Sequence, residues 1–297
     1  MLSILIPTYN YSIVELVNRV HKQALNAEII FEIIVIDDFS SDKEITENNS
    51  TIEKLSFTTL YKNRKNLGRT ATRNLLAQKA KNKLLLFLDA DVLPKYDDFI
   101  IRFQLDKNKD CQVIYGGVSY YKDKPKSINI LRWKYGLERE AKSVEEREKE
   151  PFVIISQNLL IETNLFQKLN ANNTNAYGLD ILFSNNLKEK KIPVKHIDNP
   201  VYHLGLESNE TFINKSLEAV KTTFQLEEKQ LLESNFRPLQ KSYQSLKKWR
   251  MISLFNSVIK AFKSFIKSNL LSENPSLFLF DLYKLQYYID LKIKKGE

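Results

Sequence analysis

The chain has 297 residues, of which 43% are hydrophobic, 11% aromatic and 27% charged. This balance is typical of a folded globular protein and excludes a disordered chain. The single cysteine, Cys111, excludes an internal disulfide framework and a cysteine-based zinc site, and it favours a reducing compartment such as the cytoplasm.

The positive charge of the chain is concentrated near its end. The net charge is +9, and the segment between Glu233 and Glu273 holds eight Lys and Arg residues and no acidic residue. The rest of the chain, at +1, is nearly neutral. A basic field confined to one segment argues against a protein that binds nucleic acid.

The first hundred residues alternate short apolar runs with helical patterns. Continuous apolar strands that alternate with helices predict an α/β fold with a mostly parallel sheet covered on both faces. We expect strands at 3–7, 31–36, 57–61 and 84–88, with helices at 13–24 and 68–79.

Polar residues follow three of these strands at the point where each strand ends. Because the carboxyl ends of parallel strands lie on the same edge of a sheet, these residues should converge on one crevice. They are Thr8-Tyr9-Asn10, Asp37-Asp38 and Asp89-Ala90-Asp91.

The two carboxylates of Asp89 and Asp91 come directly after an apolar run, where an unpaired buried carboxylate would be costly. At the mouth of an open α/β sheet such a pair can hold a hard divalent cation, often shared with substrate phosphates. The alternative is an acidic turn, since Asp is a common turn former.

The middle of the chain is more mixed. We expect a strand at 113–118 with a kink at Gly116-Gly117, a charged helix or loop at 137–149, a strand at 152–155, a short helix that ends at 166–169, a helix from 178, and strands at 194–197 and 201–203.

From residue 208 the pattern is helical, and an apolar stripe at helical spacing runs from Leu246 to Ile266 with basic residues between its members. Our hypothesis is that 245–271 forms an interfacial helix on an anionic membrane surface. The alternative is a helix packed on the rest of the chain, as we expect for 275–295. No run approaches the ~18 apolar residues of a membrane span, and we expect no secretory signal.

Several motifs, in this order, resemble those of a family 2 glycosyltransferase with the GT-A fold. The resemblance covers roughly 2–207 and implies a catalytic domain there, with a nucleotide-binding half at 1–100 and an acceptor half at 101–207. Residues 208–297 would form a C-terminal helical, basic extension. The motifs are 3–10, 35–42, Asn66-Leu67-Gly68-Arg69, Ala71-Thr72-Arg73-Asn74, Asp89-Ala90-Asp91, Tyr177-Gly178-Leu179-Asp180 and 199–203.

In such enzymes a sugar moves from a nucleotide-diphosphate donor to an acceptor hydroxyl. The resemblance implies that Asp38 accepts a hydrogen bond from the base or ribose; the alternative is that Asp38 or Asp37 caps the following helix. Arg69 and Arg73, which share a helix face, would contact the diphosphate, or else form a surface pair. Other implied nucleotide-sugar contacts are Pro7, Thr8, Tyr9, Asp89 and Ala90.

Three further roles follow from the resemblance. Asp91 and His203 would hold Mn²⁺ or Mg²⁺, with Asp89 on the ribose or beside the metal ligands; without the resemblance, a lone His after a strand is more often structural. Asp180 would act as the general base of a single displacement that inverts the anomeric carbon. The alternative for Asp180 is a helix N-cap.

The chain departs from the family pattern at two positions. Members often carry Gly where Phe39 stands and Glu where Leu179 stands, which changes the wall near the nucleobase and weakens any assignment of the acceptor. The Gln-x-x-Arg-Trp signature of processive synthases is absent. The absence of this signature and of spans that could form a channel favours transfer of a single sugar rather than polymerisation.

We therefore predict an inverting, metal-dependent transferase of the hexosyltransferase type that uses a UDP-sugar in cell-surface polysaccharide or glycolipid assembly. The acceptor would be a saccharide or lipid-linked saccharide, and the enzyme would be cytoplasmic and peripheral to the membrane. One alternative is a nucleotidyltransferase acting on sugar phosphates, which the lack of any glycine before Gly68 disfavours. Another is an inactive protein that only binds a sugar nucleotide.

Overall fold

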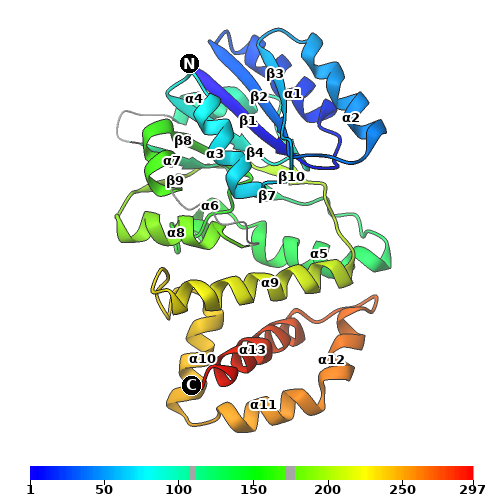
Figure 1. Cartoon of the computed structure of the whole chain (residues 1–297), viewed down its shortest axis with the longest axis vertical. Coiled ribbons are helices and arrows are strands. Elements are labelled where there is room, and N and C mark those ends of the chain that lie inside the picture. The colour runs from blue at the N-terminus through cyan, green and yellow to red at the C-terminus, as the bar shows by residue number, and fades with distance from the viewer. Residues whose placement is uncertain (107–110, 171–177, 297) are drawn as a thin grey trace. The chain divides into compact units, whose positions relative to one another are not determined.

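The computed structural model describes residues 1–106, 111–170 and 178–296 (Figure 1). Its described residues group into two compact units. The first comprises 1–121, 140–175 and 186–205, and the second comprises 122–139, 176–185 and 206–297. The predicted boundary at 207 therefore lies close to the start of the last segment of the second unit, which also takes in two earlier stretches of chain.

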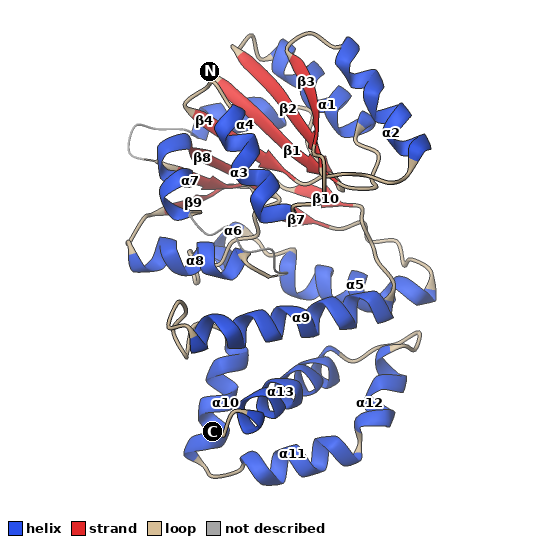
Figure 2. Cartoon of the chain, in the orientation of Figure 1, coloured by secondary structure: helices blue, strands red, loops and turns tan. Residues whose placement is uncertain are grey.

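The first unit is built on a seven-stranded sheet in the order β3-β2-β1-β4-β8-β6-β9. Helices pack against the strands, which Figure 2 shows in red. The strands are β1 (Leu2–Thr8), β2 (Phe31–Asp37), β3 (Thr58–Lys62), β4 (Leu84–Leu88), β6 (Val113–Tyr115), β8 (Asn158–Glu162) and β9 (Val194–His196). The helices are α1 (Val14–Asn26), α2 (Lys43–Ser50), α3 (Arg69–Lys79), α4 (Phe99–Asp106), α6 (Val144–Glu148), α7 (Thr163–Leu169) and, partly in each unit, α8 (Asp180–Glu189).

The predicted mostly parallel α/β sheet is confirmed. β3, β2, β1 and β4 run parallel, and only β8 is antiparallel to its neighbours β4 and β6. The β1–β2 register pairs Thr8 with Asp37, so the polar residues after these two strands lie side by side. The core beneath them consists of fully buried aliphatic side chains such as Ile4, Ile6 and Val35.

The chain leaves this sheet after β6 to form a second one. Gly117, with a φ of +89°, turns the backbone, and a Cβ on Gly116 would lie 2.4 Å from Nδ2 of Asn158. The predicted strand at 113–118 is therefore two strands in two sheets. The second sheet has the order β5 (Val92–Pro94), β10 (Val201–His203), β7 (Val118–Ser119).

The strand predicted at 152–155 is wrong. Phe152 lies in a turn that is closed by the hydrogen bond from the Val153 N–H to the Glu150 carbonyl, at 3.0 Å, and residues 153–155 have an irregular backbone. The strand β8 begins at Asn158. The apolar run was misleading because Ile154 is buried although its backbone is irregular. The side chain of Asn158 is fully buried and donates to the carbonyls of Gly117 and Asn199, at 2.8 and 2.9 Å.

The second unit is helical in its described residues. A core of apolar side chains that includes Leu131, Phe212 and Phe280 joins α5, α9 and α13. Lys292 of α13 is buried and ion-paired with Glu227, at 3.1 Å. The helices are α5 (Ile130–Tyr135), α9 (Asn209–Glu228), α10 (Pro238–Lys248), α11 (Ile252–Ala261), α12 (Lys263–Leu270) and α13 (Leu277–Lys294). In the described part of the chain, none of the helices is both long enough and apolar enough for a bilayer span.

The single helix predicted through 245–271 is wrong, because the helix is interrupted between α10 and α11 and again between α11 and α12. Arg250 has a φ of +56°, its N–H donates to the Lys247 carbonyl, and the Met251 N–H donates to the Leu246 carbonyl at 2.9 Å. This pair of bonds is a Schellman motif, which usually has glycine where Arg250 stands.

Because an L-residue is strained at this φ, we expect Arg250→Gly to raise the free energy of unfolding by about 0.5–1 kcal/mol. Urea denaturation measures this change. Arg250→Ala is the control, because it removes the charge but keeps the strain and should give no gain. Equal stabilisation by both substitutions would contradict the strain argument.

Candidate active site

The ends of β1, β2 and β4 bring Thr8, Asp38, Asp89 and Asp91 to one edge of the first unit, as the sequence predicted. Of the three carboxyl groups that follow these strands, those of Asp89 and Asp91 are held by basic or histidine side chains. A buried carboxylate is tolerated where it is paired. The edge is therefore built around fixed negative charges.

The Asp38 carboxylate holds the loop that precedes α3. It accepts hydrogen bonds from the N–H groups of Leu67 and Gly68, at 2.9 and 2.8 Å, and from the side-chain amide of Asn63, at 2.7 Å. Asp38 is 5% exposed. Asp38 therefore shapes this loop, and a nucleotide contact from the same carboxylate stays a prediction.

The capping alternative for Asp37 and Asp38 is wrong. Asp42 caps α2, because its side chain accepts from the Ile45 N–H at 3.1 Å. The Asp37 side chain instead accepts from the Ser40 N–H within the turn after β2. In that turn Phe39 is exposed with a φ of +71°, which accounts for a preference for glycine at this position.

The segment after β1 is tied to the same turn. Asn10 Oδ1 accepts from the N–H groups of Ser41 and Asp42, at 2.9 and 3.2 Å. Thr8 is buried and donates to the Tyr11 carbonyl at 3.0 Å, whereas the side chain of Tyr9 is exposed. Among Pro7, Thr8 and Tyr9, Tyr9 is thus the one best placed to meet a ligand.

Asp89 is held by two guanidinium groups. Arg73 is 4% exposed and donates to Asp89 and to both the hydroxyl and the carbonyl of Ser156. Arg69 is half-exposed, with its Nη1 3.5 Å from Oδ2 of Asp89. The two arginines predicted to contact a diphosphate therefore differ: Arg73 is buried and holds Asp89 in position, whereas Arg69 is accessible at the edge.

Asp91 contacts His203, which is distant from it in the sequence. β10 pairs antiparallel with β5, so that His203 lies opposite Val92, and the Leu204 N–H donates to the Asp91 carbonyl at 2.8 Å. Nε2 of His203 is 3.3 Å from Oδ2 of Asp91. The predicted pair is thus in contact.

The surroundings of Asp91 favour its charged form. Burial alone raises the pKa of this carboxyl, but the hydrogen bond from His203 and the charges of His203 and Arg69 outweigh burial, so the pKa is lowered. Nearby, burial and then the charge of Asp91 raise the pKa of the Tyr11 hydroxyl. An ionised carboxylate is the form that binds a cation.

Asp91 and His203 fit a divalent ion as a pair of ligands. Adjacent ligands of an octahedral ion at about 2.1 Å are roughly 3 Å apart, close to the 3.3 Å between the two side chains. Nδ1 of His203 is buried without a hydrogen-bond partner in the described structure. No cluster of three or more His, Cys, Asp and Glu side chains suited to a metal occurs among the described residues, so further ligands would come from substrate or water.

Gly205 leaves room for the Asp91 carboxylate. A Cβ on Gly205 would lie 2.2 Å from Oδ2 of Asp91. Only glycine permits this approach, because real Cβ atoms do not come so close to another heavy atom. Gly205 and Ser156 are site residues that the sequence reasoning missed; the spacing His203-Leu204-Gly205 was the available signal for the first, and nothing marked the second.

Asp180 lies in the second unit, where it is the first residue of α8. A carboxylate in the first turn of a helix is stabilised by the helix dipole. Tyr177, from the same motif, lies outside the described residues.

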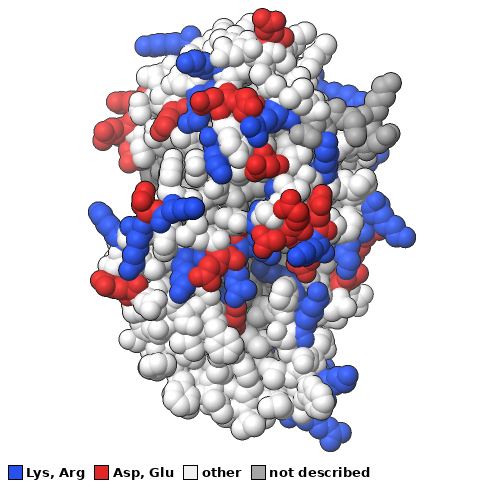
Figure 3. Space-filling model, turned by 180° about the vertical axis from the view of Figure 1, so that it is seen from behind, with Lys and Arg blue, Asp and Glu red and all other residues white. Residues whose placement is uncertain are grey.

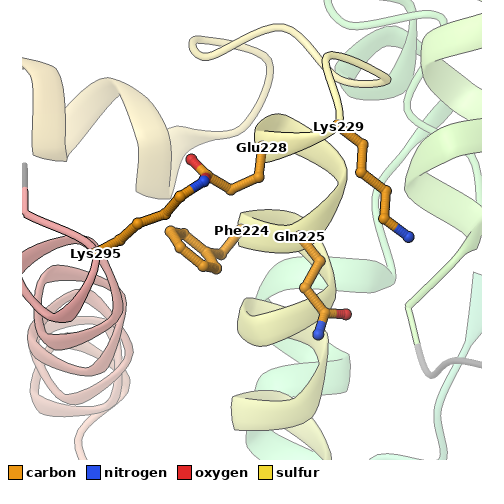
Figure 4. A pocket seen from close by; sticks show the side chains of 5 residues that line it. All are labelled: Phe224, Gln225, Glu228, Lys229 and Lys295. Atoms are coloured by element: carbon orange, nitrogen blue, oxygen red, sulfur yellow. The ribbon is translucent and has the colours of Figure 1, made fainter.

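A cavity in the second unit has a volume of about 290 Å³ and is remote in sequence from these strand ends. Figure 4 shows that Glu228 and Lys295 meet at its wall beside Phe224. Glu228 also lies 3.6 Å from Lys292. Because its only carboxylate is already paired with lysines, this cavity offers no second cation site.

The sheet order, with the antiparallel strand β8 between β4 and β6, and the acidic edge fit the GT-A fold. The sequence profile described as Glycosyl transferase family 2 matches residues 3–167. The chain belongs to this family.

Curated relatives agree over a shorter stretch. An uncharacterized glycosyltransferase of Haemophilus influenzae is 32% identical over 113 residues, which is 36% of this chain and 40% of that protein. A second one from the same organism is 28% identical over 117 residues, 39% and 38% of the two chains. The matches therefore span about two fifths of the relatives' length.

Two solved structures have the same fold. A mannosyltransferase, PcManGT from Pyrobaculum calidifontis in complex with GDP-Man and Mn²⁺, aligns over 99% of this chain and 86% of its own, with a TM-score of 0.58 and 14% identity. S. aureus TarS 1-349 in complex with UDP-GlcNAc aligns over 100% and 92%, with a TM-score of 0.52 and 16% identity.

We expect Asp38→Asn to lower the free energy of unfolding by about 2 kcal/mol, because hydrogen bonds to a charged acceptor are lost and an amide N–H₂ would face backbone donors. Urea denaturation measures this. Asp42→Asn is the matched control, since Asn caps a helix as well as Asp does. An unchanged stability for Asp38→Asn would show that the carboxylate does not hold the loop.

Proposed function

We propose that this chain is an inverting, metal-dependent transferase of the hexosyltransferase type. It moves one sugar from a nucleotide-diphosphate sugar to an acceptor hydroxyl. The observation that carries the proposal is the contact between Asp91 and His203 beside Asp89 and Arg69, at the carboxyl edge of the sheet. Oxygen, imidazole and guanidinium groups gathered at that edge suit a metal-bound diphosphate.

Different residues would contact different parts of the donor. Arg69, half-exposed beside Asp89, would pair with the diphosphate, while buried Arg73 keeps Asp89 in place for the ribose. Exposed Tyr9 and Phe39 would flank the nucleobase, next to Thr8, Asp38 and Ala90. Asp91 and His203 would hold Mn²⁺ or Mg²⁺, which when bound would stabilise the charge on the departing nucleotide diphosphate.

The transfer is a single displacement. The acceptor oxygen forms a bond to the anomeric carbon as the bond from that carbon to the diphosphate breaks, and the configuration inverts. The nucleoside diphosphate leaves with the bonding electron pair. Asp180 accepts the proton of the acceptor hydroxyl, so the charges balance. This role for Asp180 is supported by the family motif and by its place at the start of α8.

The acceptor in this proposal is a saccharide or lipid-linked saccharide of cell-surface polysaccharide or glycolipid assembly. A lipid-linked acceptor would bring the chain to an anionic membrane surface. A UDP-sugar is the first donor to test and a GDP-sugar the second, since similar structures hold UDP-GlcNAc and GDP-Man.

Hydrolysis of sugar nucleotides in the presence of Mn²⁺ tests the metal assignment. We expect Asp91→Ala to lower turnover about a hundredfold or more, because a metal contact to the diphosphate is worth several kcal/mol. Asp97→Ala, at an exposed surface carboxylate, is the control and should keep wild-type turnover. Equal rates in Asp91→Ala and wild type would refute the assignment, and donor binding without turnover in the wild type would favour a binding-only protein.

Asp180→Asn tests the general base. We expect it to lower transfer by about 10²–10⁴-fold, because the base is removed, while donor affinity by calorimetry stays near that of the wild type. Glu189→Gln, at the other end of α8, is the matched control. Loss of donor binding in Asp180→Asn, or unchanged transfer, would argue against the role.

A further inference from the structure

Helix α11 carries apolar side chains on two faces. Ile252, Phe255 and Ile259 turn inward and pack with the cores of the second unit. Folding accounts for this inner stripe. Leu254 and Val258 are exposed on the other side, and folding does not account for them.

The outer stripe continues beyond α11. Phe262, between α11 and α12, and Phe265, within α12, follow Val258 at helical spacing and are 57% and 64% exposed. Trp249, just before α11, is 71% exposed. Large contiguous apolar patches are uncommon on protein surfaces that contact only water, and they mark interaction sites.

The basic residues beside the stripe fall into two groups. Lys260 of α11 and Lys267 of α12 are paired with Asp290 and Glu210, at 2.8 and 3.9 Å. Lys247, Lys248 and Arg250 surround Trp249, and none of the three has an ion-pair partner in the described part of the chain. No acidic residue occurs from 234 to 272. In Figure 3 the lower end of the molecule is largely uncharged surface with Lys and Arg along one side, and side chains of both signs border it above.

We propose that the surface formed by α10–α12 inserts its aromatic side chains into the headgroup region of an anionic lipid bilayer. This α10–α12 surface is defined by Lys247, Lys248, Trp249, Arg250, Leu254, Val258, Phe262 and Phe265. Exposed Trp and Phe with neighbouring Lys and Arg are the composition of interfacial anchors. None of the residues that define this surface is acidic, so its charge is complementary to anionic headgroups. A second copy of this chain would bring the same positive charge and be repelled, which favours lipid as the partner.

The anchor differs from a single amphipathic helix. The inner stripe of α11, with Phe255 and Ile259, and Ile266 of α12 already pack against the cores of the unit, so they are not available to lipid. Trp249 and Phe262 lie at the two ends of α11, where the helix is interrupted. Membrane binding therefore needs no unfolding of the helices. That it would bring the enzyme to a lipid-linked acceptor rests on the proposed function; the binding itself does not.

Flotation of the full chain with phosphatidylcholine vesicles, with and without about 30% phosphatidylglycerol, tests this surface. We expect binding only with phosphatidylglycerol. We also expect binding to be lost in 0.5 M salt, because the Debye length falls to about 3 Å as the ionic strength approaches 1 M. We expect at least a hundredfold weaker partitioning for each of two triple variants, since several contacts are removed together. They are Trp249→Ser/Phe262→Ser/Phe265→Ser and Lys247→Glu/Lys248→Glu/Arg250→Glu.

Matched controls change the same properties elsewhere. Lys22→Glu/Lys54→Glu/Lys81→Glu lowers the net charge equally, and Ile30→Ser/Leu105→Ser/Ile128→Ser removes three exposed apolar side chains. Both should float like the wild type. Asp91→Ala should also float, so that failure of the transferase proposal and failure of this one are distinguishable. Circular dichroism and thermal unfolding check that each variant is folded.

Three results would overturn the proposal. The first is no flotation of the wild type with anionic vesicles. The second is equal loss of binding in the charge-matched control, which would reduce the effect to net charge. The third is a wild-type dimer, detected by light scattering, that the triple Ser variant dissociates while flotation is unchanged; the surface would then bind a second copy.

Discussion

The buried ion pair between Arg73 and Asp89 is the interaction on which the site depends. A carboxylate at the end of a buried strand needs a partner, because leaving it unpaired would cost several kcal/mol. Arg73 supplies this charge from α3 and at the same time binds Ser156, just before β8. One guanidinium thus joins three segments of the chain beneath the proposed donor site, and removing it would leave buried Asp89 with half-exposed Arg69 as its cationic partner.

Asp91 is positioned by different means, which in the proposed function keeps the metal contact separate from the ribose contact. The Leu204 N–H binds its backbone carbonyl, His203 contacts its carboxylate, and the missing side chain of Gly205 leaves room for that carboxylate. All three come from one short segment around β10. Asp89 is thereby held by cations of the protein, whereas Asp91 faces a neutral imidazole or its conjugate acid, a partner that can also turn to a metal.

The strand ends could be predicted from the sequence because their signals are local. Apolar runs of strand length, their alternation with helical patterns and the polar residues at their ends all lie within a few positions of one another. The convergence of Thr8, Asp38 and Asp89 then follows from parallel topology alone. The strand predicted at 152–155 was wrong for the opposite reason: Ile154 is buried although its backbone is irregular, and the buried amide of Asn158 that starts β8 has no local sign.

By itself, therefore, the sequence determined the class of fold, the carboxylates of the proposed site and the basic character of the C-terminal segment. Only the tertiary structure decided which of two similar arginines is buried, why Gly205 must lack a side chain, and which apolar residues of 246–266 face the core. The physical reason is the same in each case. These properties depend on neighbours from distant parts of the chain, and on a helix end at Arg250 that carries neither the glycine nor the proline by which such ends are recognised.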